Sequence, residues 1–138
     1  MRFIRDDGGR RAAGFKGRTN DCVVRSIAIA TRAPYRLVYD EVIRLGRRYE
    51  RCPSRERSHP RTGVWIVTTK HLMALWGWEW CYAVGGIRLC DLPRGRYVVS
   101  MQGHVTAVCD RTIRDTWNCE DHASGRVLGV FVRADLLW

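Results

Sequence analysis

The sequence predicts an α+β fold, with helices in the first half of the chain and an antiparallel sheet in the second. Between about residues 22 and 76, apolar residues recur every three or four positions, as they do along one face of a helix. After Gly77 the pattern changes to short runs rich in Val, Trp and Tyr, separated by Gly and Pro. Helices followed by strands are the order of an α+β protein. The 138 residues are 46% apolar, so we expect one domain, 1–138, with its own core.

Three helices are expected in order. The first runs from about Cys22 to Arg32, with Asn20 or Asp21 available as its cap. The second begins at Pro34, because proline is favoured in the first turn of a helix. Its apolar stripe comprises Tyr35, Val38, Val42, Leu45 and Tyr49. The third spans about Val64–Trp76.

The remaining segments are turns, loops and strands. The Gly-rich, basic residues 1–19 are expected to form an irregular arm, and the charged, Pro-containing residues 51–61 a loop. Five strands are expected, at about Trp78–Val84, Arg96–Gln102, His104–Cys109, Ile113–Asn118 and Val127–Arg133.

The net charge of +10 comes from 24 basic and 14 acidic residues, and only Lys16 and Lys70 are lysines. Such a surface attracts nucleic acid, acidic proteins or anionic substrates. An arginine-rich, lysine-poor composition is also what a GC-rich genome produces. The sequence contains no nucleic-acid-binding motif that would decide between the two explanations, so nucleic acid stays a possible partner.

The predicted location is the cytoplasm. No apolar run approaches the length that spans a membrane, and the first residues lack the apolar core of a secretory leader. The six cysteines are therefore expected to be reduced thiols. They are Cys22, Cys52, Cys81, Cys90, Cys109 and Cys119. There is no C-x-x-C motif, and Cys119 with His122 supplies only two ligands, so neither a metal nor another cofactor is predicted.

Three residues have the properties of a thiol acyl-transfer site. Cys22 stands at a helix start, where unpaired N–H groups and the helix dipole stabilise a thiolate. His104 begins a strand and could act as a base, and Asp115 on the next strand could orient it. The competing interpretation is that Cys22 is a small apolar core residue.

Strand register distinguishes Asp115 from the alternative orienter, Asn118. A two-residue turn at Asp110-Arg111 would place His104 opposite Trp117, with Asp115 diagonal to His104 on the same, core-facing side of the sheet. A three-residue loop would place Asn118 opposite His104 instead. Asp-Arg is a poorer tight turn than Asp-Gly, so Asn118 remains a candidate.

Two motifs resemble the papain-like cysteine peptidase superfamily, especially its small bacterial and phage members. They are Asn20-Asp21-Cys22 at the helix start and the hairpin from His104-Val105-Thr106-Ala107-Val108 to Asp115-Thr116-Trp117. The resemblance covers roughly residues 15–120. It implies a nucleophile helix packed on an antiparallel sheet, and a thiol protease with a Cys-His-Asp catalytic triad.

On this resemblance we expect a peptidase or isopeptidase that acts on a protein or peptide substrate through an acyl-enzyme. Many papain-like enzymes carry a glutamine six residues before the nucleophile, but this chain has Lys16 there. Asn20, with the backbone N–H of Cys22, is the substitute candidate for the oxyanion hole, or it is only a helix cap. The alternatives are an amidase, deamidase or acyltransferase using the same triad, or a basic, non-catalytic binding protein for nucleic acid or an acidic host protein.

Overall fold

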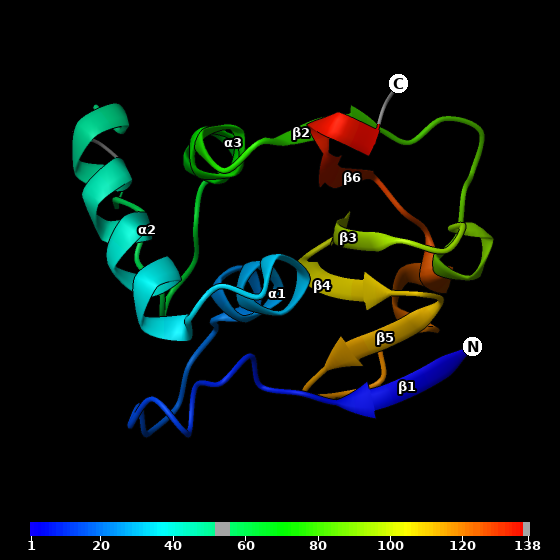
Figure 1. The fold of residues 1–138 in the computed structure, drawn as a ribbon, viewed down its shortest axis with the longest axis horizontal. Coiled ribbons are helices and arrows are strands. Elements are labelled where there is room, and N and C mark those ends of the chain that lie inside the picture. Colours follow the sequence, from blue (N-terminus) through cyan, green and yellow to red (C-terminus); the bar gives the residue numbers. More distant parts are fainter. Residues whose placement is uncertain (52–55, 137–138) are drawn as a thin grey trace.

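A computed structural model describes residues 1–51 and 56–136, and within these ranges it shows an α+β fold of three α-helices and six strands (Figure 1). The helices are α1 (Cys22–Thr31), α2 (Tyr35–Tyr49) and α3 (Ile66–Leu75). The strands are β1 (Arg2–Arg5), β2 (Trp78–Tyr82), β3 (Arg96–Met101), β4 (His104–Cys109), β5 (Thr112–Asp115) and β6 (Gly129–Arg133). Cys52 and part of the loop expected over residues 51–61 lie outside the described residues.

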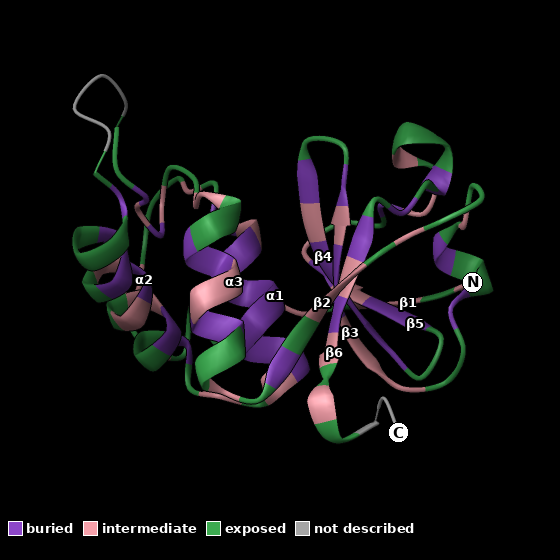
Figure 2. Cartoon of the chain, turned by 90° about the horizontal axis from the view of Figure 1, so that it is seen from above, coloured by how far each residue is buried: buried purple, intermediate pink, exposed green. Residues whose placement is uncertain are grey.

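The strands form one sheet in the order β1-β5-β4-β3-β6-β2. Neighbouring strands are antiparallel except β1 and β5, which are parallel. Helix α1 packs on β4, β3 and the end of β5, and α2 lies farther from the sheet (Figure 2). The central helix therefore carries its first residue, Cys22, to the sheet.

The core has a layer on each side of the sheet, because neighbouring residues of a strand point to opposite faces. Val98 packs with Val24 and Ile27 of α1, and all three are fully buried. The adjacent Val99 packs on the other side with Val108. This second cluster is built from strands and connecting segments; its buried members are Leu89, Leu92, Val99, Met101, Val108, Ile113, Cys119 and Val127.

The irregular arm expected over residues 1–19 is wrong for residues 2–5. These residues form β1, which pairs in parallel with β5 at the edge of the sheet. Phe3 packs against the second core cluster, so the strand gains apolar burial as well as backbone hydrogen bonds. A parallel partner more than a hundred residues away leaves no local signal in the sequence.

The expected register of the hairpin is confirmed. Asp110 and Arg111 both have positive φ angles, 48° and 64°, as the two central residues of a type I′ turn require. Val108 consequently pairs with Ile113. The last strand residue is Asp115, earlier than expected, so Trp117 lies beyond the strand. Its side chain is 42% exposed, and the expectation that it faces the core is wrong.

The starts of the first two helices also differ from expectation. Asp21 is the N-cap residue of α1, but its side chain makes no capping hydrogen bond. Pro34 is the N-cap of α2 rather than its first helical residue. Within the described ranges, no helix combines the length and apolar character needed to cross a lipid bilayer.

Candidate functional site

The structure gathers the predicted site residues where α1 meets the sheet. Cys22 is the first residue of α1, His104 the first of β4, and Asp115 the last of β5. The I′ turn determines which residues of β4 and β5 are neighbours, and the packing of α1 on β4 brings up the thiol. Residues distant in sequence therefore meet through the hairpin register and one helix–sheet contact.

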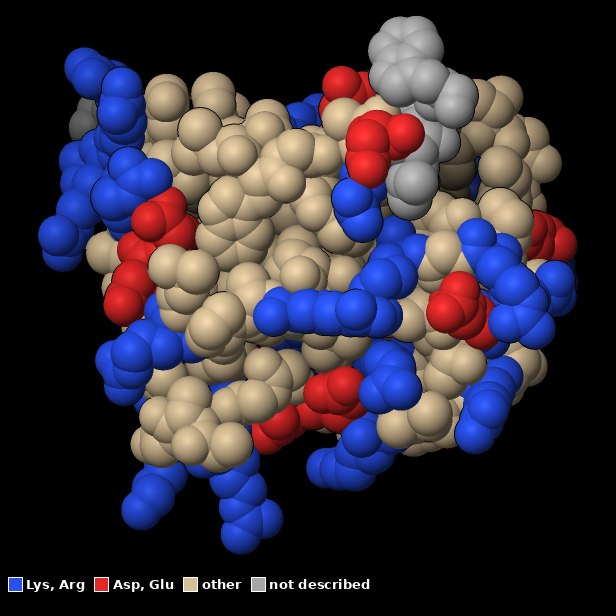
Figure 3. Space-filling model, in the orientation of Figure 1, with Lys and Arg blue, Asp and Glu red and all other residues tan. Residues whose placement is uncertain are grey.

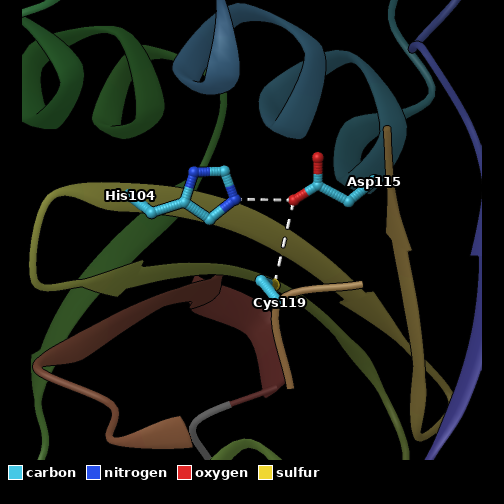
Figure 4. A group of neighbouring side chains, drawn as sticks. All are labelled: His104, Asp115 and Cys119. Atoms are coloured by element: carbon cyan, nitrogen blue, oxygen red, sulfur yellow. Dashed lines mark hydrogen bonds and ion pairs between the residues drawn. The ribbon is translucent and has the colours of Figure 1, made fainter. Parts of the chain in front are cut away.

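His104 and Asp115 form the tightest contact of the site. Nε2 of His104 lies 2.7 Å from Oδ2 of Asp115, and the two residues are 8% and 0% exposed (Figure 4). Burial alone would lower the pKa of His104, but contacts with Asp115, Cys119 and Cys22 outweigh it and raise this pKa to about 11. The imidazole is therefore a cation at neutral pH, and Nε2 donates to the carboxylate.

The pKa of the Cys22 thiol is lowered, which favours its thiolate form. Burial alone would raise its pKa, but the imidazole of His104, the backbone N–H of Val105 and the charge of Arg25 lower it overall. Because Nε2 of His104 faces Asp115, Nδ1 is the ring nitrogen left for the thiol. The imidazole and the N–H of Val105 both favour the thiolate by hydrogen bonding to Sγ.

Arg25 is a site residue that the sequence analysis missed. Its guanidinium lies between two buried carboxylates: Nη1 is 2.5 Å from Oδ1 of Asp21, and Nη2 is 3.0 Å from Oδ1 of Asp115. Burial alone would raise the pKa of Asp115, but the hydrogen bond from His104 and the charge of Arg25 lower it. The i,i+4 spacing could have indicated the pair with Asp21. No sequence spacing indicated the pair with Asp115.

Asp21 helps to fix the start of α1. Its Oδ2 accepts a 2.6 Å hydrogen bond from the hydroxyl of Tyr35 on α2 and lies 3.8 Å from Nε of Arg10. With Arg25 on its other oxygen, this carboxylate links the N-terminal segment, α1 and α2. The side chain of Asp21 is thus engaged in tertiary contacts, which explains why it does not cap α1.

Trp117, His122 and Cys119 surround the imidazole. The ring centroids of Trp117 and His122 lie 4.7 Å and 6.0 Å from that of His104. Sγ of the fully buried Cys119 lies 3.9 Å from Oδ2 of Asp115 (Figure 4). The sequence placed His122 in a late polar turn and paired it with Cys119 as a possible ligand; its Nε2 contacts the carbonyl of Gln102 at 2.7 Å.

A metal could in principle use part of this cluster. Ligand atoms of His104, Asp115 and Cys119 lie within 4.8 Å of one another, and all three residues are buried. The Nε2–Oδ2 contact of 2.7 Å occupies two of the three candidate ligand atoms. A metal would also compete with Arg25 for the charge of Asp115. The arrangement therefore suits a charge-assisted hydrogen bond better than a metal centre.

The other predicted residues lie at the surface. Asn118 is exposed and its Oδ1 accepts from the backbone N–H of Glu120, so it does not orient His104. Asn20 is exposed just before α1, where its backbone N–H donates to the carbonyl of Arg61. Lys16 is exposed and lines a hollow beside Asp21.

Comparison with known proteins adds no relative. The sequence shows no significant match to a known protein family, to a curated protein or to a solved structure. The functional argument therefore depends on the residues and geometry described above.

Proposed function

We propose that the protein is a cysteine-dependent hydrolase of papain-like type, and specifically a peptidase or isopeptidase. Cys22 is the nucleophile, His104 the base and later the acid, and Asp115 the residue that orients His104. One observation carries the proposal. A helix-start thiol with a lowered pKa lies beside a histidine whose other side is held by a buried aspartate.

The reaction uses the thiolate–imidazolium pair directly. The thiolate of Cys22 attacks the carbonyl carbon of the substrate, and its electron pair forms the C–S bond while the carbonyl oxygen takes up negative charge. The oxyanion collapses, the C–N bond breaks, and His104 gives its proton to the leaving amine. A water then attacks the thioester as His104 accepts one of its protons. Release of the carboxylic acid restores the thiolate and the imidazolium.

The surroundings support the same roles. The backbone N–H of Cys22 is in the first turn of α1, where it has no partner within the helix, and can donate to the oxyanion. Asn20 is the side-chain candidate for a second donor, because it is exposed two residues before the nucleophile. Arg25 acts as a positioning residue: it holds Asp115, which in turn holds His104.

Thiol alkylation tests the proposal without a known substrate. Cys22 should react with iodoacetamide at pH 6 faster than the other described cysteines, because its pKa is lowered by His104 and the thiolate is the reactive form. The fast reaction should disappear in Cys22→Ala and slow strongly in His104→Ala. It should persist in Cys90→Ala, which removes an exposed thiol away from the site. Slow labelling of Cys22 in the folded wild type would reject the catalytic role in favour of the basic, non-catalytic binding protein.

An amidase, deamidase or acyltransferase would use the same three residues in the same first step. The second step distinguishes these activities, because water, or a second amine or alcohol, takes the acyl group. Mass spectrometry of the thioester on Cys22, and of the product after its decay, reports which acceptor is used.

A further inference from the structure

Two hollows with basic walls flank the residues that precede Cys22. One, of about 460 Å³, is lined by parts of the N-terminal segment and by Asp21 and Arg25. The other, of about 450 Å³, is lined by Arg18, Thr19, Asn20 and Arg61. Thr19 belongs to both. Asn20 lines one hollow and Asp21 the other, so the two hollows adjoin on either side of the start of α1.

The acidic groups of the hollows are already occupied. Asp21 is held by Arg25 and Tyr35, and Asp7 accepts backbone hydrogen bonds from Gly9 and Arg11. Several basic side chains of the hollows have no such charged partner among the described residues. Among the described residues, none of these four has an ion-pair partner: Arg11, Lys16, Arg18 and Arg61. The uncompensated charge beside the nucleophile is therefore positive, and over the face shown in Figure 3 basic side chains outnumber acidic ones.

A second observation concerns the wall that the hollows share. Oγ1 of Thr19, which lines both, is buried and has no hydrogen-bond partner among the described residues. Buried hydroxyls usually have such a partner. A carboxylate or backbone carbonyl at the junction of the hollows would supply that acceptor once the Thr19 side chain rotates toward it.

We propose that the two hollows bind an acidic polypeptide segment on both sides of the bond that Cys22 attacks. This inference rests on the proposed function and adds a substrate class to it. A chain lying through both hollows passes Asn20 and Asp21, and so presents its backbone to the start of α1. Glutamate or aspartate side chains on either side meet arginine, whose guanidinium pairs with carboxylates in two-pronged hydrogen bonds.

Charge alone would also attract single-stranded nucleic acid, but the linings favour a peptide. Proteins that bind single strands offer aromatic faces on which bases stack. Phe15 is the aromatic residue in these described linings. Its ring already packs against Tyr35 and Tyr39, with the guanidinium of Arg36 4.9 Å from its centroid. The hollows therefore offer charge without a free stacking surface.

The test compares two variants with the same change in net charge. Arg11→Glu/Arg18→Glu reverses one exposed arginine at each hollow, and Arg47→Glu/Arg48→Glu reverses two exposed arginines at the end of α2. Binding of a fluorescent Glu-rich peptide is measured by anisotropy at low salt, in a Cys22→Ala background that prevents turnover. We expect the first variant to bind at least about tenfold more weakly, and the second to bind like its parent.

Three results would overturn the proposal. They are equal weakening by both variants, no binding to the parent protein, and tighter binding of single-stranded DNA than of the peptide at the same hollows. Iodoacetamide labelling of Cys22 separates this failure from failure of the proposed function. The reagent is uncharged, so Arg11→Glu/Arg18→Glu with Cys22 intact should keep the fast reaction. Slow labelling of Cys22 in the wild type, together with normal peptide binding by Cys22→Ala, would count against the catalytic role alone.

Discussion

Replacing Cys22 by alanine should change how the stability of the protein depends on pH. In the folded protein the pKa of Cys22 lies below its ordinary value of 9.0, and that of His104 is raised from 6.5 to about 11. The lowered cysteine pKa contributes stability that is fully present above pH 9 and is lost as pH falls through the folded pKa. The raised histidine pKa contributes stability that is present below pH 6.5 and is lost as pH rises towards about 11.

In the wild type these two effects oppose each other between pH 6.5 and 9. At pH values above the folded pKa of Cys22, the unfolded chain carries a proton on the thiol and the folded protein carries one on His104, so their proton counts match. Stability from this pair is then nearly independent of pH. In Cys22→Ala only the histidine effect remains, because Asp115 is a stronger cause of the raised pKa of His104 than Cys22 is. The variant should lose up to about 1.4 kcal/mol per pH unit relative to the wild type.

Urea unfolding of both proteins in reducing buffer, at several pH values across this window, measures the difference. Cys109→Ala is the matched control, because burial raises the pKa of Cys109 and its thiol stays neutral in both states below pH 9. The difference in the free energy of unfolding between Cys109→Ala and the wild type should not vary with pH. Parallel pH profiles for Cys22→Ala and the wild type would show that the thiolate–imidazolium pair does not form.

Two further predictions concern the residues that hold His104. Arg25→Met should lower the free energy of unfolding by about 3–5 kcal/mol, and the melting temperature by roughly 10–20 °C, because it leaves two buried carboxylates without their cation. Arg44→Met, which breaks an exposed pair, should melt like the wild type, and equal melting of the two variants would contradict the buried clamp. Asp115→Asn should slow alkylation of Cys22 at least roughly tenfold and move the alkaline limit of the reaction, set by a His104 pKa of about 11, to lower pH. Asn118→Ala should change neither property, and the reverse result would mean that the wrong residue has been assigned as orienter.

Much of the candidate site could be predicted because its signals are local. The helix start at Cys22 follows from apolar periodicity, and the strand at His104 from its alternation. The position of Asp115 followed from counting residues across a two-residue turn, since side chains alternate along strands. The length of the turn, two residues rather than three, was enough to prefer Asp115 over Asn118.

The remaining features depend on contacts between distant parts of the chain. Strand β1 exists because β5 offers it a parallel edge, and the Gly-rich sequence after it suggested no strand. Arg25 looked like one more basic residue in a basic chain, and only the approach of α1 to β5 gave it a second buried carboxylate. Trp117 appeared to continue a strand that ends two residues earlier, and it covers His104 instead of entering the core.

The sequence by itself therefore determined the α+β order, the helix that begins at Cys22 and the register that pairs His104 with Asp115. These depend on hydrophobic periodicity and turn geometry, which act over a few residues. Only the tertiary structure decided the direction in which the pKa values of the site residues shift. A pKa is set by burial and by the charges that packing brings near, here Arg25, and neither can be read from the order of residues along the chain.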